Sequence, residues 1–110
     1  EILLKQQVEM DAVVCYNDQI ALEVIRSLQK NGKRVPEDIS VTGYDNSVIA
    51  EGTVGLTTIA HPQEKLGEMA AELLLEKIRK VPEEKSRIPR LIQPELIVRG
   101  STKDRNTENG

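Results

Sequence analysis

The sequence predicts an open α/β fold built on a parallel sheet. Short apolar runs alternate with amphipathic helical stretches, and the first two runs both end in Asn or Asp. About 20 residues separate these two runs, which suits a crossover helix between parallel strands better than a hairpin. The expected element order is β-α-β-β-α-β, with ligands outside the carboxyl ends of the strands.

The first half of the chain predicts one βαβ unit. Residues 1–10 have the pattern of the end of a helix, and residues 12–16 form an apolar run typical of a strand covered on both faces. Residues 20–28 place apolar side chains at helical spacing, and Gly32 supplies a left-handed residue that ends a helix. Residues 39–44 alternate as a strand does.

The second half predicts a further strand, a long helix and a closing strand. Residues 56–59 favour a short strand, and residues 62–80 a helix with Pro62 at its first position. Residues 91–99 contain two strand-like runs separated by a proline, which indicates an edge or a bend. Residues 100–110 are polar, and we expect them to be a frayed tail.

Composition excludes several kinds of site. The 110 residues carry 15 Lys and Arg against 18 Asp and Glu, a net charge of −3. This acidic balance does not favour binding to the phosphate backbone of a nucleic acid. Two Tyr without Phe or Trp cannot form a stacking platform for single-stranded nucleic acid. One Cys and one His can form neither an internal disulfide nor a Cys/His zinc site. No apolar run is long enough to span a membrane.

Polar residues follow the first two predicted strands. Asn17 and Asp18 end the first strand, and Asp45 and Asn46 end the second. If the strands are neighbours, these side chains converge on one edge of the sheet, where amide and carboxylate groups can hold the hydroxyls of a sugar. The alternative is local, because the same residue types cap helices and make turns.

No arrangement of residues predicts catalysis. Neither a phosphate-binding glycine loop nor a nucleophile elbow is present. Cys15 lies inside a predicted strand, which indicates a small buried apolar side chain. His61 precedes a helix, where it is either a cap or surface residue or a ligand donor. The residues alone therefore predict the small-molecule-binding part of an α/β protein, and an open α/β enzyme is an alternative without support.

Several stretches with matching order and spacing resemble the lactose/galactose repressor (LacI/GalR) family, and the resemblance runs from about residue 11 to 102. They are Asp-Ala-Val-Val-Cys-Tyr-Asn-Asp-Gln-Ile-Ala-Leu at 11–22, Gly-Lys-Arg-Val-Pro-Glu-Asp-Ile-Ser-Val-Thr-Gly-Tyr-Asp at 32–45, Leu-Thr-Thr-Ile at 56–59 and Pro-Glu-Leu-Ile-Val-Arg at 94–99.

The resemblance implies a periplasmic-binding-protein-like open parallel sheet in two lobes with a sugar between them. This chain is then the C-terminal portion of an effector-binding domain and holds parts of both lobes. Residues 11–59 are expected in the C-terminal lobe, residues 62–80 as a helix of the N-terminal lobe, and residues 91–99 crossing back. We expect a longer parent protein, because no Met begins the chain and residues 1–5 have the pattern of a helix interior.

The resemblance also assigns effector-binding roles by position. Asn17 and Asp45 match the family's effector-contacting Asn and Asp, and His61 stands where the family usually has Gln. Tyr16, Asp18 and Asn46 are expected to support them. The Cys-Tyr-Asn-Asp and Gly-Tyr-Asp-Asn stretches are most similar to the arabinose-responsive members, so L-arabinose is the expected sugar.

The family resemblance implies a cytoplasmic transcriptional repressor without cofactor, metal or membrane partner. It would act as a homodimer through a helix face that carries Leu22, Ile25 and Arg26, although plain core packing also explains these residues. Operator DNA would be bound by a domain absent from this chain. The alternative is a periplasmic sugar-binding protein of a transport system, which a signal peptide on the parent would indicate.

Overall fold

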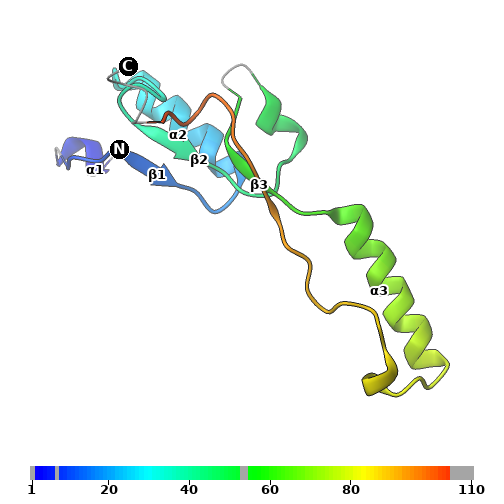
Figure 1. Cartoon of the computed structure of the whole chain (residues 1–110). Coiled ribbons are helices and arrows are strands. Elements are labelled where there is room, and N and C mark those ends of the chain that lie inside the picture. Colours follow the sequence, from blue (N-terminus) through cyan, green and yellow to red (C-terminus); the bar gives the residue numbers. More distant parts are fainter. Residues whose placement is uncertain (1, 7, 53–54, 105–110) are drawn as a thin grey trace. The chain divides into compact units, whose positions relative to one another are not determined.

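The computed structural model describes residues 2–6, 8–52 and 55–104 of the chain (Figure 1). The described residues form two compact units. Unit 1 takes the residues up to Ala60 and from Leu96 onward, and unit 2 is His61–Glu95. The elements in chain order are α1 (Ile2–Lys5), β1 (Ala12–Val14), α2 (Asp18–Lys30), β2 (Ser40–Thr42), the 3-10 helix η1 (Val48–Glu51), β3 (Thr58–Ala60), α3 (Gln63–Ile78), the 3-10 helix η2 (Glu83–Lys85) and β4 (Glu95–Ile97).

A parallel sheet forms the centre of unit 1. Ala12, Val13 and Val14 of β1 pair in parallel with Ser40, Val41 and Thr42 of β2. On the other side of β2, parallel bridges join Thr42 to Thr57 and Asp45 to Ala60, which places β3 next to β2. β3 in turn pairs with β4. The predicted parallel sheet and element order are therefore confirmed.

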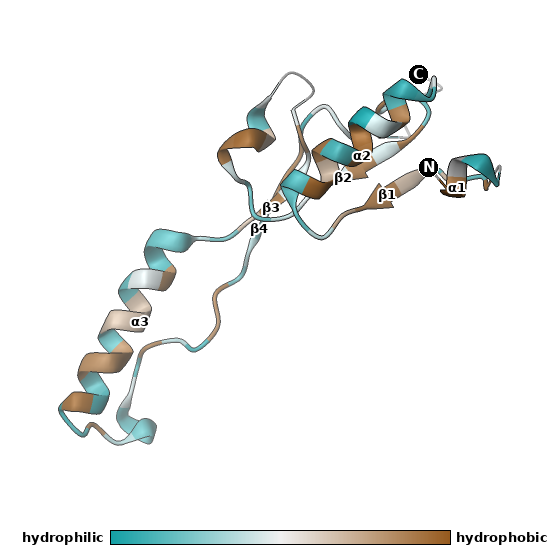
Figure 2. Ribbon diagram, turned by 180° about the vertical axis from the view of Figure 1, so that it is seen from behind, coloured by the Kyte–Doolittle hydropathy of each residue, from teal (hydrophilic) through white to brown (hydrophobic). Residues whose placement is uncertain are grey.

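α2 covers the sheet with the apolar face that its sequence predicts. Figure 2 shows apolar and polar turns alternating along this helix. The helix ends as predicted, since Gly32 has a φ of +80° and the Lys33 N–H donates to Leu28 O at 2.9 Å. The buried core of unit 1 consists of Cys15, Ala21, Ile25, Leu28, Val35, Ile39, Val41, Ala50 and Leu56. Most of the core is contributed by α2, β2 and the segments that flank β2.

Three predictions of local structure are corrected. The predicted strand run at residues 91–92 is irregular, and α3 begins at Gln63, one residue later than predicted. The start of the expected frayed tail is ordered, because Ser101 is 0% exposed. Its Oγ donates to Val41 O at 2.6 Å and accepts from the Thr57 N–H at 2.8 Å, which ties this segment to β2. Residues 105–110 lie outside the described residues.

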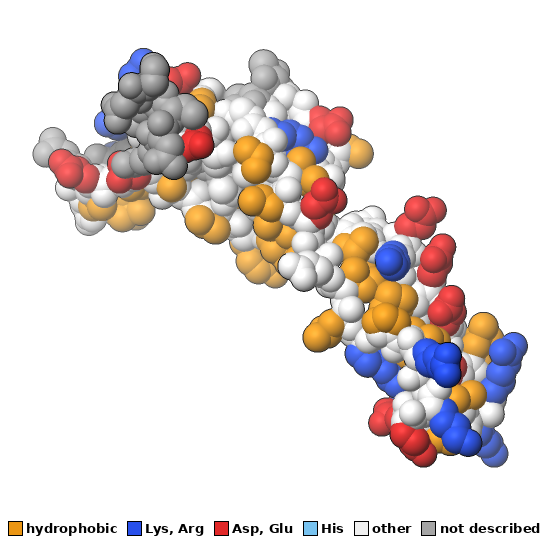
Figure 3. All heavy atoms as spheres, viewed as in Figure 1, with side chains coloured by type: hydrophobic (Ala, Val, Ile, Leu, Met, Phe, Trp, Pro, Cys, Tyr) orange, Lys and Arg blue, Asp and Glu red, His pale blue; other side chains and the backbone are white. Residues whose placement is uncertain are grey.

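Unit 2 is built differently, because no side chain of α3 is buried. Apolar side chains lie exposed along this helix, as the orange surface in Figure 3 shows. They include Leu66, Leu74, Leu75 and Ile78. Burial of apolar area is the main stabilising term in folding, so the core of the described chain is the core of unit 1. No helix in the described ranges is long and apolar enough to cross a bilayer.

A close approach of two backbone segments explains one glycine. A Cβ built on Gly43 would lie 2.7 Å from Leu56 Cδ2 and closer still to Asp18 Oδ1. Any side chain at Gly43 would therefore displace the buried Asp18 at the start of α2.

We predict that Gly43→Ala lowers the free energy of unfolding by about 1–3 kcal/mol, because of this overlap. Gly67→Ala is the matched control, because nothing lies within 4 Å of its added Cβ and the position is helical; that change should be neutral or stabilising. Urea unfolding of both variants measures the difference, and an unaltered midpoint for Gly43→Ala would contradict the proposed overlap.

Candidate functional site

A hollow of about 480 Å³ opens at the carboxyl ends of β1 and β2. Cys15, Tyr16, Tyr44 and Asp45 line it. Parallel pairing brings these residues together, since Tyr16 and Tyr44 each lie two residues beyond paired strand ends, at Val14 and Thr42. The Asp18 N–H donates to Tyr44 O at 3.1 Å and holds the two loops side by side. The hollow lies at the edge where an open α/β sheet binds its ligands.

Both tyrosines of the chain line this hollow. Tyr16 is 84% exposed and Tyr44 is also exposed. A ring presented in this way offers an apolar face with a hydroxyl at its edge, which suits an amphipathic small molecule. Cys15 also lines the hollow and is buried, and desolvation raises the pKa of its thiol above the usual value.

Asp45 adopts an unfavourable backbone conformation at the rim of the hollow. Its φ is 102°, and the next residue, Asn46, has a φ of 53°. Asn and Asp tolerate this region better than other residues with a Cβ, yet it remains costly. The Asp45 N–H donates to Ile59 O at 2.9 Å, which holds the turn against β3. Backbone strain of this kind is a feature of binding sites.

Asn17 lies at the same edge of the sheet but its side chain caps α2. Its Oδ1 accepts a hydrogen bond from the Ile20 N–H at 2.9 Å, with extended backbone angles typical of an N-cap. Asn17 lines a separate hollow along the α2 surface rather than the one that contains Asp45. The local interpretation of Asn17 is therefore confirmed, and an additional contact of its amide with an effector stays a prediction.

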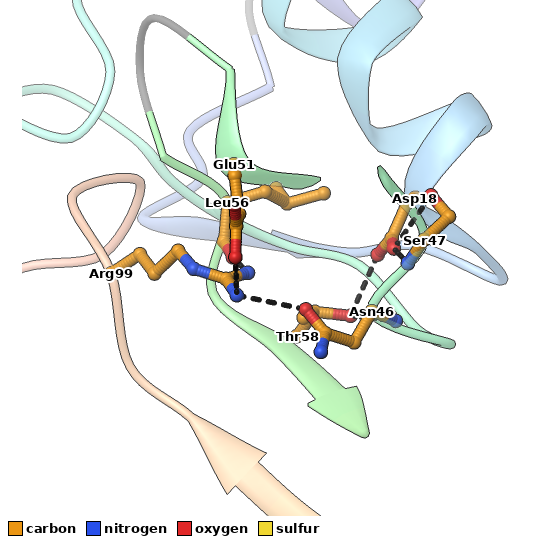
Figure 4. Close-up of polar contacts among 7 residues, drawn as sticks. All are labelled: Asp18, Asn46, Ser47, Glu51, Leu56, Thr58 and Arg99. Atoms are coloured by element: carbon orange, nitrogen blue, oxygen red, sulfur yellow. Dashed lines mark hydrogen bonds and ion pairs between the residues drawn. The ribbon is translucent and has the colours of Figure 1, made fainter. Parts of the chain in front are cut away.

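Asp18 is the centre of a buried polar network (Figure 4). It is 1% exposed, and its Oδ1 accepts from Thr58 Oγ1 at 2.6 Å. Its Oδ2 accepts from the N–H and Oγ of Ser47 at 2.6 and 3.1 Å. As the first residue of α2, it also places a carboxylate at the positive end of the helix dipole. The network joins α2, the loop after β2, and β3 beneath the Asp45 turn.

A second network reaches the Asp45 turn from the C-terminal segment (Figure 4). Arg99 donates from Nη1 to Leu56 O at 2.9 Å and from Nη2 to Asn46 Oδ1 at 2.8 Å. The Asn46 N–H donates to Thr58 Oγ1 at 3.3 Å. Asn46 is thus held by hydrogen bonds at both its backbone and its side chain.

The remaining predicted residues lie elsewhere. His61 directly follows β3 as the first residue of unit 2, is half-buried, and accepts a hydrogen bond at its carbonyl from the Gln63 N–H. A ligand contact by its ring stays a prediction. Ile25 is 3% exposed within the core of unit 1, so its expected place in a dimer interface is corrected to core packing. Leu22 is half-buried and Arg26 is exposed with an ion pair to Glu23.

Sequence reasoning missed Tyr44 as a lining residue and Arg99 as a support of the turn. The signal for Tyr44 was available, because both tyrosines stand at the same distance beyond paired strands. Arg99 has no such signal, since 53 residues separate it from Asn46. No cluster of His, Cys, Asp or Glu suitable for a metal ion occurs among the described residues.

Residues 2–102 match the model of the periplasmic binding protein-like domain. The chain belongs to this family. A solved structure of a LacI family transcriptional regulator from Arthrobacter sp. FB24 in complex with lactose superposes with a TM-score of 0.80 at 30% sequence identity, covering 93% of this chain and 39% of that one. The predicted periplasmic-binding-protein-like fold is therefore confirmed.

Curated relatives of this family member are repressors. The chain is 46% identical over 96 residues to the HTH-type transcriptional repressor PurR of Vibrio campbellii, which covers 86% of the chain and 28% of that protein. It is 44% identical over 95 residues to the arabinose metabolism transcriptional repressor of Geobacillus stearothermophilus, covering 84% of the chain and 26% of that protein. The chain thus spans about a quarter of the length of these two repressors.

We predict that Thr58→Val lowers the free energy of unfolding by about 1–3 kcal/mol, because the near-isosteric change leaves Asp18 Oδ1 buried without its hydroxyl donor. Thr58→Ser retains the hydroxyl and is the matched control, with a smaller loss from the missing methyl group. Urea unfolding of the two variants compares them, and equal losses would show that the hydrogen bond contributes nothing.

Proposed function

We propose that the chain is the effector-binding part of a sugar-responsive transcriptional repressor. The observation that carries this proposal is the hollow at the carboxyl ends of β1 and β2, lined by Tyr16, Tyr44 and Asp45 together with Cys15. A sugar presents hydroxyls that donate to a carboxylate and C–H faces that pack on aromatic rings. The lactose complex of the Arthrobacter regulator gives independent support for a sugar effector.

The residues have separate roles in the proposed site. Asp45 accepts hydrogen bonds from sugar hydroxyls, and the exposed Tyr16 and Tyr44 rings flank the sugar. Asn17 keeps its capping role through Oδ1 and offers its amide nitrogen to the effector, while His61 contributes a ring nitrogen. Asp18 and Asn46 support the site by stabilising the turn that carries Asp45.

The proposed mechanism couples sugar binding to operator affinity. Sugar binding between lobes favours one lobe arrangement over another, and in a homodimer this changes the spacing of two DNA-binding domains. A differential affinity of about 1–3 kcal/mol between the two states is sufficient for such a switch. The DNA-binding domains would lie outside this chain, and the repressor would act in the cytoplasm, where its operator DNA is.

L-arabinose is the first effector to test, because of the similarity to the arabinose metabolism repressor of Geobacillus stearothermophilus. The chain is more identical to the PurR repressor than to the arabinose repressor. Binding of an effector other than L-arabinose is therefore one outcome of that test. A periplasmic transport component is not favoured, because the relatives with high identity are repressors.

We predict that Asp45→Asn in the full-length repressor weakens sugar binding about tenfold, since a charge-assisted hydrogen bond becomes a neutral one. Asn retains the shape of Asp and its tolerance of a positive φ, so the turn should keep its backbone conformation. Calorimetric titration with L-arabinose, galactose and ribose measures the affinity, and operator affinity without sugar should not change.

The matched control is Glu37→Gln, an exposed carboxylate in the loop before β2, at the opposite end of the strand. It should leave sugar affinity as it is in the wild type. Sugar binding by Asp45→Asn at wild-type strength would remove Asp45 from the site, and an absence of binding by the wild type to any of the three sugars would contradict a sugar effector from this set.

We predict a second effect of the sugar, on the reactivity of Cys15. The thiol lines the hollow and burial raises its pKa, so it should react slowly with iodoacetamide at pH 8. At nine-tenths occupancy by sugar the rate should fall about tenfold, because only the empty fraction reacts. Mass spectrometry of the peptide that contains Cys15 measures this rate, and equal rates with and without bound sugar would place the effector elsewhere.

A further inference from the structure

Arg99 is fixed at both its backbone and its guanidinium. Thr57 Oγ1 accepts from the Arg99 N–H at 2.9 Å and donates to the Arg99 carbonyl at 3.2 Å. The guanidinium donates to Leu56 O and to Asn46 Oδ1, and Glu51 Oε1 lies 3.7 Å from Nη2. The side chain is only 18% exposed, so these contacts are partly shielded from water.

The hydrogen bond to Asn46 reaches the most strained part of unit 1. Asp45 and Asn46 both have positive φ values, and two such residues in succession are unfavourable for any sequence without glycine. The turn persists because its neighbours hold it, namely Ile59 O at the Asp45 N–H and Thr58 Oγ1 at the Asn46 N–H. Arg99 adds a hydrogen bond to the Asn46 side chain of this turn.

We propose that Arg99 is a positioning residue for the effector site. Its guanidinium donates to Leu56 and Asn46, neither of which lines the hollow, yet by holding Asn46 it keeps Asp45 in its strained, ligand-ready conformation. A site that is already in its binding conformation does not lose affinity to ordering on binding. The effect on effector affinity rests on the proposed function, whereas the effect on the turn does not.

The decisive variant is Arg99→Met in the full-length repressor, followed by two measurements. Without sugar, hydrogen exchange of the amides of residues 45–47 should accelerate at least fivefold, while exchange in the middle of α2 stays unchanged. Affinity for whichever of L-arabinose, galactose or ribose the wild type binds should fall about tenfold. Arg99→Lys should give intermediate values, because a single ammonium keeps the charge but cannot reproduce both hydrogen bonds of the planar guanidinium.

Two controls separate positioning from a general effect of charge. Arg34→Met removes a guanidinium that donates to Asp38 through both Nε and Nη2, in the loop before β2, and it should alter neither measurement. Glu51→Gln removes the outer ion pair of Arg99 at 3.7 Å and should also leave both unchanged. An effect of either control as large as that of Arg99→Met would overturn the proposal.

A third variant tests the same proposal if Arg99→Met does not fold. Asn46→Gly removes the same hydrogen bond from its other end, and glycine accepts the φ of 53° without strain. It should reproduce the faster exchange at residues 45–47, and Asn46→Asp, which retains the acceptor oxygen, should restore slow exchange. Adding Arg99→Lys to Asn46→Gly should then produce little further change.

The outcomes separate this proposal from the proposed function. Unchanged exchange at residues 45–47 in Arg99→Met or Asn46→Gly overturns the positioning role, whatever happens to affinity. Faster exchange with unchanged sugar affinity also overturns it, because the turn then does not govern binding. If the wild type binds none of the three sugars, the sugar proposal fails for this set, and the exchange measurement alone decides the role of Arg99.

Discussion

The buried Asp18 carboxylate is the constraint on which the rest of unit 1 depends. It accepts hydrogen bonds from Ser47 in the loop after β2 and from Thr58 in β3, while its own backbone starts α2. A buried carboxylate is tolerated only when donors satisfy it, and here three donor groups come from two segments outside α2. Each of those segments must be in place before the others become stable. The requirement for glycine at position 43 follows from the same carboxylate.

The Asp45 turn is built on top of this constraint. Asp18 and Thr58 form a rigid base, Thr58 also accepts from the Asn46 N–H, and Arg99 binds the Asn46 side chain. The strain of two successive positive φ values is offset by these contacts. The backbone conformation of Asp45 is therefore held by contacts that form when unit 1 folds.

The sequence predicted the parts of the fold that depend on local patterns. Alternation of apolar runs, the helical stripe of α2 and the stop at Gly32 all rely on near neighbours, and each is present. The parallel pairing of β1 with β2 then placed Asn17 and Asp45 at one edge, as expected. What could not be predicted depends on contacts between distant residues. Ser101 is buried by β2, and Asn46 is held by Arg99.

The contrast between Asn17 and Asp45 shows why residue type alone does not define a binding site. Both are short polar residues after paired strands, but their backbones differ. Asn17 is extended and its Oδ1 is occupied by the helix that follows, so its first role is structural. Asp45 has a left-handed φ, is followed by a loop instead of a helix, and lines the hollow. The backbone therefore distinguishes the two more sharply than the side chains, and it favours Asp45 as the centre of effector recognition.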